Sequence, residues 1–160
     1  MSLEDNKTIV RKMFEAWNRG DLEAVQGYWS SDTINHGRFA DSDPRDQRMP
    51  RGIDGLRRVL NSLQTAFPDR RWDVTDTIAE GDRVMCRITV SGTHRGIPAM
   101  PVEGGPFLQA IQPTGLHYSV QHMHAFRIAD GKIAEHWAAR DDLALLEELG
   151  GLPEPRPVGA

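Results

Sequence analysis

The sequence predicts an α+β domain in which helices pack on an antiparallel sheet. Apolar residues recur at helical spacing before residue 68, and they alternate with polar residues over much of residues 71–139. Helices that precede a run of strands, without regular alternation of the two, are typical of this class. A chain of 160 residues suffices for one domain with a core and a pocket. We therefore expect a single domain over residues 1–150, followed by a Pro-rich arm over residues 151–160.

The N-terminal half is expected to contain three helices and one long loop. Helical spacing of apolar residues covers three segments, residues 3–19, 22–29 and 52–67. Gly20 and Asp21 separate the first two helices, and Pro68 ends the third. The polar stretch 32–50 follows neither period, and a loop of this length is usually a lid, a binding element or a mobile segment.

The second half is expected to contain strands. Four segments alternate as half-buried strands do, near residues 71–78, 83–95, 116–129 and 132–139. Asp130 and Gly131 predict a two-residue turn between the last two strands, because this pair tolerates positive φ angles. The intervening segment 96–115 contains too much Gly and Pro for a central strand, so we expect a loop there.

Composition and charge exclude several functional classes. A net charge of −4 with scattered basic residues provides no electrostatic footprint for nucleic acid. No apolar run approaches the roughly 20 residues that cross a bilayer, and no signal peptide is evident, so we expect a cytoplasmic protein without membrane contact. Cys86 is the only cysteine, which excludes a disulfide framework and a thiolate metal cluster. We expect this thiol to be buried and inert.

Histidines mark the candidate site. One parity of the segment 116–129 is formed by Tyr118, Val120, His122, His124, Phe126 and Ile128. Alternate strand residues share a face, so two imidazoles should face inward with the apolar row, and His136 on the returning strand should lie beside them. An imidazole titrates near about 6.5, which suits it to take and return protons at neutral pH.

Short motifs spread over nearly the whole chain carry a family resemblance. They are Phe14–Leu22, Ala66–Asp69, Ala79–Val84, Phe126–Arg127, Asp130–Ile133 and Glu135–Trp137. On these motifs the chain resembles the SnoaL-like polyketide cyclases of the nuclear-transport-factor-two-like superfamily. The resemblance implies a cone-shaped α+β barrel, in which a curved antiparallel sheet wraps around N-terminal helices and a short C-terminal helix follows. It also implies an open cavity at the wide end and a homodimer formed through the outer face of the sheet.

The same resemblance implies an activity. The family's cyclases close a ring of a hydrophobic polyketide ester by an intramolecular aldol reaction, with no metal or cofactor, because the substrate's carbonyls stabilise the carbanion. His124 matches a position that carries a catalytic histidine, and His122 matches a polar pocket position. Asn35 resembles an asparagine of the pocket, and the adjacent His36 is expected to face substrate.

One position departs from the family pattern. The cyclases carry their principal acid–base aspartate on the last strand, where this chain has Ala138. The role has therefore moved to His136 or Asp141, or the chemistry differs; Asp141 is equally suited to cap the last helix. Further expected substrate contacts are Arg140, Trp17 and Trp29, although the tryptophans also fit a packed core.

Three other functions remain open. Family members that hydroxylate aromatic polyketides without metal or flavin share the Glu135–Trp137 run. His122 and His124, two residues apart on one face, could bind zinc or iron together with His136 or a carboxylate. The spacing alone is weak evidence for such a site. A pocket that only binds a small molecule is the third alternative, although three histidines exceed what binding requires.

Overall fold

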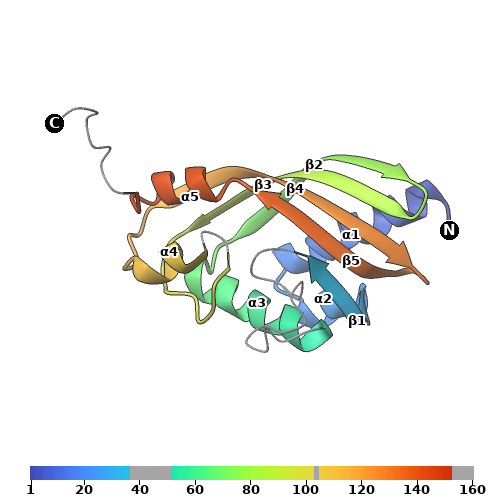
Figure 1. Ribbon diagram of the computed structural model, residues 1–160, viewed down its shortest axis with the longest axis horizontal. Coiled ribbons are helices and arrows are strands. Elements are labelled where there is room, and N and C mark those ends of the chain that lie inside the picture. The colour runs from blue at the N-terminus through green and yellow to red at the C-terminus, as the bar shows by residue number, and fades with distance from the viewer. Residues whose placement is uncertain (37–51, 103–104, 153–160) are drawn as a thin grey trace.

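The computed structural model describes residues 1–36, 52–102 and 105–152, and it shows a sheet that arches over a layer of helices (Figure 1). The elements in chain order are α1 (Leu3–Asn18), α2 (Leu22–Gly27), β1 (Trp29–His36), α3 (Gly52–Ala66), β2 (Arg71–Glu80), β3 (Arg83–Thr93), α4 (Gly105–Ala110), β4 (His117–Ala129), β5 (Lys132–Arg140) and α5 (Asp142–Glu148). The predicted α+β class with a short C-terminal helix is confirmed.

The sheet has the strand order β1-β5-β4-β3-β2. Strands β2 to β5 are antiparallel neighbours, as expected, whereas β1 pairs with β5 in parallel. The sheet is therefore mixed rather than purely antiparallel. Two parallel strands can be joined only by a long crossover connection, and here the chain between β1 and β5 forms that connection.

Strand β1 corrects two expectations. Trp29 was expected on the second helix and residues 32–36 in a loop, but all belong to one strand. The run Ser30–Asp32 is polar, so the segment has no clear alternation, and only pairing with β5, a hundred residues later, makes it a strand. The remainder of the expected loop, residues 37–50, lies outside the described residues.

Helix α1 forms where the sequence predicts it. Ser2 and Asp5 exchange side-chain to backbone hydrogen bonds in a capping box, and Gly20 adopts a φ of 72° after the helix ends. Its apolar stripe, including Val10, Met13 and Phe14, is buried against the sheet. The helix thus supplies one wall of the space beneath the strands.

The closing hairpin and β3 follow the predicted alternation. Asp130 and Gly131 have φ angles of 50° and 73°, which gives the predicted two-residue turn. Alternate residues of β4 are buried, among them the row that contains His122 and His124. Cys86 on β3 is buried, as expected, and burial raises the pKa of its thiol to about 12, which disfavours the reactive thiolate.

The segment 96–115, expected as a loop, contains helix α4. Gly105 with a φ of 56° precedes Pro106, whose fixed φ suits the first turn of a helix. Leu108 anchors this short helix in the core. Over the described residues, no helix is both long and apolar enough to span a membrane. Of the expected C-terminal arm, only residues 151 and 152 are described.

Candidate active site

A cavity of about 220 Å³ lies between the inner face of the sheet and the helices. Its described lining comes from α1, β1, α3, β2, β4, β5, the start of α5 and the segment before α4. It comprises Met13, Phe14, Trp17, Trp29, Asn35, His36, Leu56, Val59, Leu63, Trp72, Pro101, Val102, His124, Phe126, His136, Ala138, Arg140 and Asp142. Aromatic and aliphatic side chains dominate, and the polar groups gather on β1, β4 and β5. Such a lining is typical of a pocket for a mostly apolar small molecule.

A chain of hydrogen bonds joins three of the predicted site residues. Nδ1 of His124 lies 2.8 Å from Nε2 of His136, and Nδ1 of His136 lies 2.6 Å from Oδ1 of Asn35. Pairing of β5 with β4 on one side and β1 on the other brings these residues together, with Asn35 directly beside His136. The sequence predicted all three as site residues, but not that they form one connected chain.

The lowered pKa values of His124 and His136 favour the neutral form of both imidazoles at physiological pH. Burial lowers the pKa of His124 well below its usual value, and the positive charges that His136, His122 and Arg140 can carry lower it further. Burial, then the charges of Arg140 and His36, lower the pKa of His136 to about 3. Each imidazole is therefore a proton acceptor at one nitrogen and a donor at the other.

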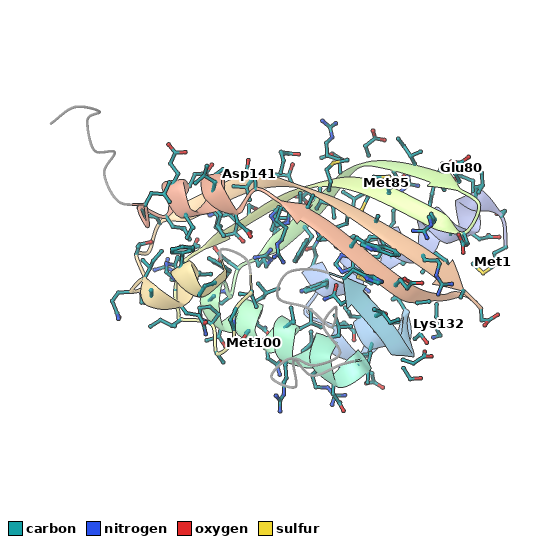
Figure 2. The ribbon with its side chains drawn as sticks, in the orientation of Figure 1. Met1, Glu80, Met85, Met100, Lys132 and Asp141 are labelled. Carbon is teal, nitrogen blue, oxygen red and sulfur yellow. The ribbon has the colours of Figure 1, made fainter. Side chains whose placement is uncertain are left out.

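Arg140 and an unpredicted acid complete the polar end of the cavity. Nε of Arg140 lies 3.5 Å from Oδ1 of Asp142, and both residues line the cavity. Asp141, the predicted acid, is exposed and outside the described lining; its carboxylate accepts a hydrogen bond from the backbone of Ala144 at 3.0 Å and caps α5 (Figure 2). The capping alternative for Asp141 is what the structure shows. Asp142, one residue later, points to the cavity because the helix begins there.

Ala138 lines the cavity next to these groups. In the register of β4 and β5 it is the cross-strand partner of His124. The position at which the family resemblance implies an aspartate therefore does face the pocket, and its methyl group supplies no proton. The titratable groups of the described lining near this point are those of His124, His136, Arg140 and Asp142.

His36 lines the cavity, as expected, whereas His122 lies outside the described lining. The ring of His36 stacks on Trp137 at 4.4 Å, and its Nε2 lies 2.8 Å from Oε2 of Glu135, so the imidazole is engaged with the outer side of β5 although the residue borders the cavity. His122 is buried outside the described lining, with its ring 5.7 Å from that of His124. That these two residues contact substrate stays a prediction, which for His36 agrees with its place in the cavity lining.

Tryptophan rings form much of the remaining wall. Trp17 and Trp29 line the cavity as the expected substrate contacts, and Trp72, which sequence reasoning missed, lines it too. The indole nitrogens of Trp29 and Trp72 are buried and have no hydrogen-bond partner among the described residues. Buried donors of this kind normally find a partner, so both indole N–H groups are candidate donors to a ligand. The strand parity of Trp72 was the signal that could have revealed it.

The metal alternative requires three suitable side chains around one point. Among the described residues, no three His, Cys, Asp or Glu side chains are grouped in a way that could hold a metal ion. In particular, His124 is already bonded through Nδ1 to His136. The part of the chain that the structure describes therefore does not assemble the donor set that this alternative needs.

Fold and site together define a cone-shaped α+β protein whose largely apolar, aromatic-rich pocket has histidines at its polar end. The family model of the SnoaL-like polyketide cyclases matches residues 7–149, and the chain belongs to this family. The predicted family is thereby confirmed over nearly the whole length of the chain.

Individual relatives agree with this assignment. The chain is 27% identical to the aklanonic acid methyl ester cyclase DnrD of Streptomyces peucetius, over 94% of both chains. Among solved structures, it resembles AclR of Streptomyces galilaeus, a candidate hydroxylase, with a TM-score of 0.75 and 31% identity over 95% of this chain and 100% of that one. It also resembles IdmH of Streptomyces antibioticus, a candidate polyketide cyclase, with a TM-score of 0.70 and 27% identity over 91% and 98% of the chains.

Proposed function

We propose that the protein is a cofactor-independent polyketide cyclase that closes a ring of a polyketide ester by an intramolecular aldol-type reaction. The observation that carries the proposal is the chain of neutral imidazoles, His124 and His136, at the polar end of an aromatic cavity. Membership of the polyketide cyclase family supports the reaction class. The cyclase relative DnrD, whose name specifies a methyl ester, supports the substrate class.

The reaction balances without an external reagent. A proton leaves a carbon that lies between two carbonyls, the carbanion adds to a second carbonyl of the same molecule, and the resulting alkoxide takes a proton. One carbon–carbon bond forms, and the product is an isomer of the substrate, or its dehydration product if water leaves. A carbon acid flanked by two carbonyls needs only a weak base, and a well-placed neutral imidazole can serve as that base.

The groups around His124 suit these steps. His124 takes and returns the proton, and His136 bonds it from behind and fixes its ring. The positive charge of Arg140, at the same end of the cavity, favours the enolate that develops on the substrate. The indole N–H groups of Trp29 and Trp72 are available to orient carbonyl oxygens.

The second candidate function is a cofactor-free hydroxylase of an aromatic polyketide. Two observations favour it: the likeness to AclR, the candidate hydroxylase, and the presence of Ala138 where the family resemblance implies a catalytic aspartate. This reaction consumes oxygen and leaves a heavier product, whereas ring closure does neither. The two functions are therefore separable by product mass.

The test is turnover of an aromatic polyketide methyl ester by purified, metal-analysed protein with and without oxygen. Ring closure gives an isomeric or dehydrated product in both conditions. A product heavier by one oxygen atom, formed only in air, would establish the hydroxylase instead. Binding without conversion of any such ester would support the non-catalytic alternative.

We also propose that the protein forms a homodimer through the outer face of the sheet. The pairing registers place Ile78, Met85, Ala125 and Trp137 in one row across β2, β3, β4 and β5 on this face. Ile78 and Met85 are 67% and 48% exposed, which is unusual for large apolar side chains side by side. Charged residues flank the row, as in a moderately polar subunit interface.

A further inference from the structure

The hydrogen-bond chain at the polar end of the cavity determines which imidazole nitrogen carries the proton. An amide oxygen can only accept, so Nδ1 of His136 must donate to Oδ1 of Asn35. A neutral imidazole has one N–H, which leaves Nε2 of His136 as an acceptor. Nδ1 of His124 therefore carries the hydrogen that joins the two rings, and Nε2 of His124 is left with its lone pair free.

We propose that Asn35 is a positioning residue that fixes the tautomers of His136 and His124, and thereby makes Nε2 of His124 the proton acceptor of the site. The inference rests on the proposed function for its chemical purpose. It assigns a task to a residue that touches neither the reacting carbon nor His124.

The surroundings of His124 agree with this assignment. Nε2 of His124 is buried and has no hydrogen-bond partner among the described residues, although the residue lines the cavity. The neighbouring rings of Phe14 and Trp72 meet the imidazole edge-on at 6.0 and 5.7 Å. Burial and the charge of Arg140 keep both imidazoles neutral, as a defined tautomer requires.

The position of Asn35 is itself well supported. Asn35 and His36 are in register with His136 and Trp137, so the end of β1 is held to β5 by backbone pairing. On the outer side, the contacts of His36 with Trp137 and Glu135 secure the same end of the strand. The amide of Asn35 is thus held against His136 by contacts on both sides of the sheet.

The arrangement accounts for a complete proton cycle. When Nε2 of His124 takes the proton from the substrate carbon, the resulting imidazolium still donates its Nδ1–H to Nε2 of His136. The hydrogen bond from His136 to the oxygen of Asn35 stabilises the positive charge on this pair of rings. The same proton then passes from Nε2 to the alkoxide. No proton is gained or lost, and Asn35 stays neutral throughout.

The tautomers are measured directly by long-range ¹H–¹⁵N NMR of protein labelled in its histidine side chains. We expect His124 and His136 both to show a protonated Nδ1 and a bare Nε2 in the resting protein. A protonated Nε2 on His124 would overturn the proposal, whatever the activity. Assignments come from variants His124→Gln and His136→Gln.

Two substitutions of Asn35 test the role in turnover. Asn35→Leu keeps the size of the side chain but removes the acceptor, and we expect a mixture of tautomers and a fall in kcat of about 10- to 100-fold with a smaller change in KM. Asn35→Asp restores an accepting oxygen, so it should restore the tautomer and most of kcat. Its negative charge should also move the acidic limb of the pH profile to higher pH, because it favours imidazolium.

The control is Ile34→Thr, an exposed neighbour on the same strand, which should change neither the tautomers nor kcat. Equal losses in folded Asn35→Leu and Asn35→Asp would contradict the proposal. Expected tautomers in a wild-type protein that cyclises no ester would refute the proposed function and leave the tautomer assignment standing. Cyclisation by a protein with reversed tautomers would refute this inference alone.

Discussion

Ala138 is the cross-strand partner of His124, and both residues face the cavity. A carboxylate at position 138 would adjoin the imidazole of His124, whereas the methyl group of this chain leaves that imidazole bonded to His136 alone among the described residues. The departure from the family pattern at position 138 thus lies directly beside His124. It predicts a base of low pKa that is assisted by a second imidazole rather than by an acid.

Ala138→Asp should convert the pair toward the family pattern. The new carboxylate favours the imidazolium form, so we expect a higher pKa of His124 and an acidic limb of the kcat profile shifted to higher pH. Ala138→Asn, of the same size without the charge, is the matched control and should leave the limb in place. Identical pH profiles for the two variants would contradict the geometry.

His124→Gln should remove most of the turnover. Loss of a positioned acid–base group typically costs about 10²- to 10⁴-fold in rate, and we expect the loss in kcat rather than KM. His122→Gln is the control, because His122 is buried outside the described lining. Kinetics and circular dichroism of both variants check this prediction. A loss in His122→Gln as large as that in His124→Gln would contradict it.

The histidine pair should make the fold sensitive to acid. Below pH 6.5 an unfolded chain protonates both imidazoles, while the folded chain resists until its lowered pKa values, about 3 for His136. The unfolded state therefore binds more protons, and the free energy of unfolding falls as the pH drops from about 6.5 toward 3, by roughly 1 kcal/mol per pH unit for each group.

Urea unfolding between pH 7 and pH 4 measures this dependence. The variant His136→Gln should show a shallower fall than the wild-type protein over the same interval, because one of the two buried imidazoles is gone. Parallel curves for the two proteins would show that His136 is readily protonated in the folded state.

Removing a single indole donor should weaken substrate binding. Trp29→Phe retains the apolar ring but lacks the buried N–H, which has no partner among the described residues. We expect a KM raised about 5- to 10-fold, the usual worth of one hydrogen bond, and a modest loss of stability because the smaller ring leaves part of a buried site unfilled. Calorimetric titration of both proteins with a substrate analogue measures the change in affinity. Unchanged affinity would show that the ligand does not use this donor.

If the protein dimerises through the outer face of the sheet, a charge placed in the apolar row should weaken the dimer. Met85→Lys should shift the protein toward monomer in analytical ultracentrifugation, because an unpaired ammonium in an interface is costly to desolvate. Glu80→Lys changes the charge at the exposed end of β2 and serves as the control (Figure 2). A dimer that persists in Met85→Lys would place the interface elsewhere, and a monomeric wild-type protein would refute the dimer.

The sequence was sufficient for features encoded by local periodicity. The parity of β4 correctly placed His124 on the buried face, and Asp130–Gly131 correctly predicted the turn that sets His136 beside it. These signals are local, because strand alternation and turn chemistry depend on neighbouring residues. The family resemblance added the cone and the cavity.

The sequence did not reveal features that depend on distant pairing. Strand β1 exists because it pairs with β5, and this pairing joins Asn35 to His136. The choice between Asp141 and Asp142 depended on the residue at which α5 begins, and helix ends are the least certain features of a sequence-based prediction. The outward turn of His36 follows from the same register, which periodicity within β1 could not supply.

The most direct test of the account compares wild-type protein with His124→Gln in anaerobic turnover of one aromatic polyketide methyl ester. We predict that the wild-type protein forms a product of unchanged or dehydrated mass without oxygen, and that the substitution slows its formation at least about 100-fold. An oxygenated product that requires air, or ring closure at equal rates by both proteins, would contradict histidine-centred cyclisation.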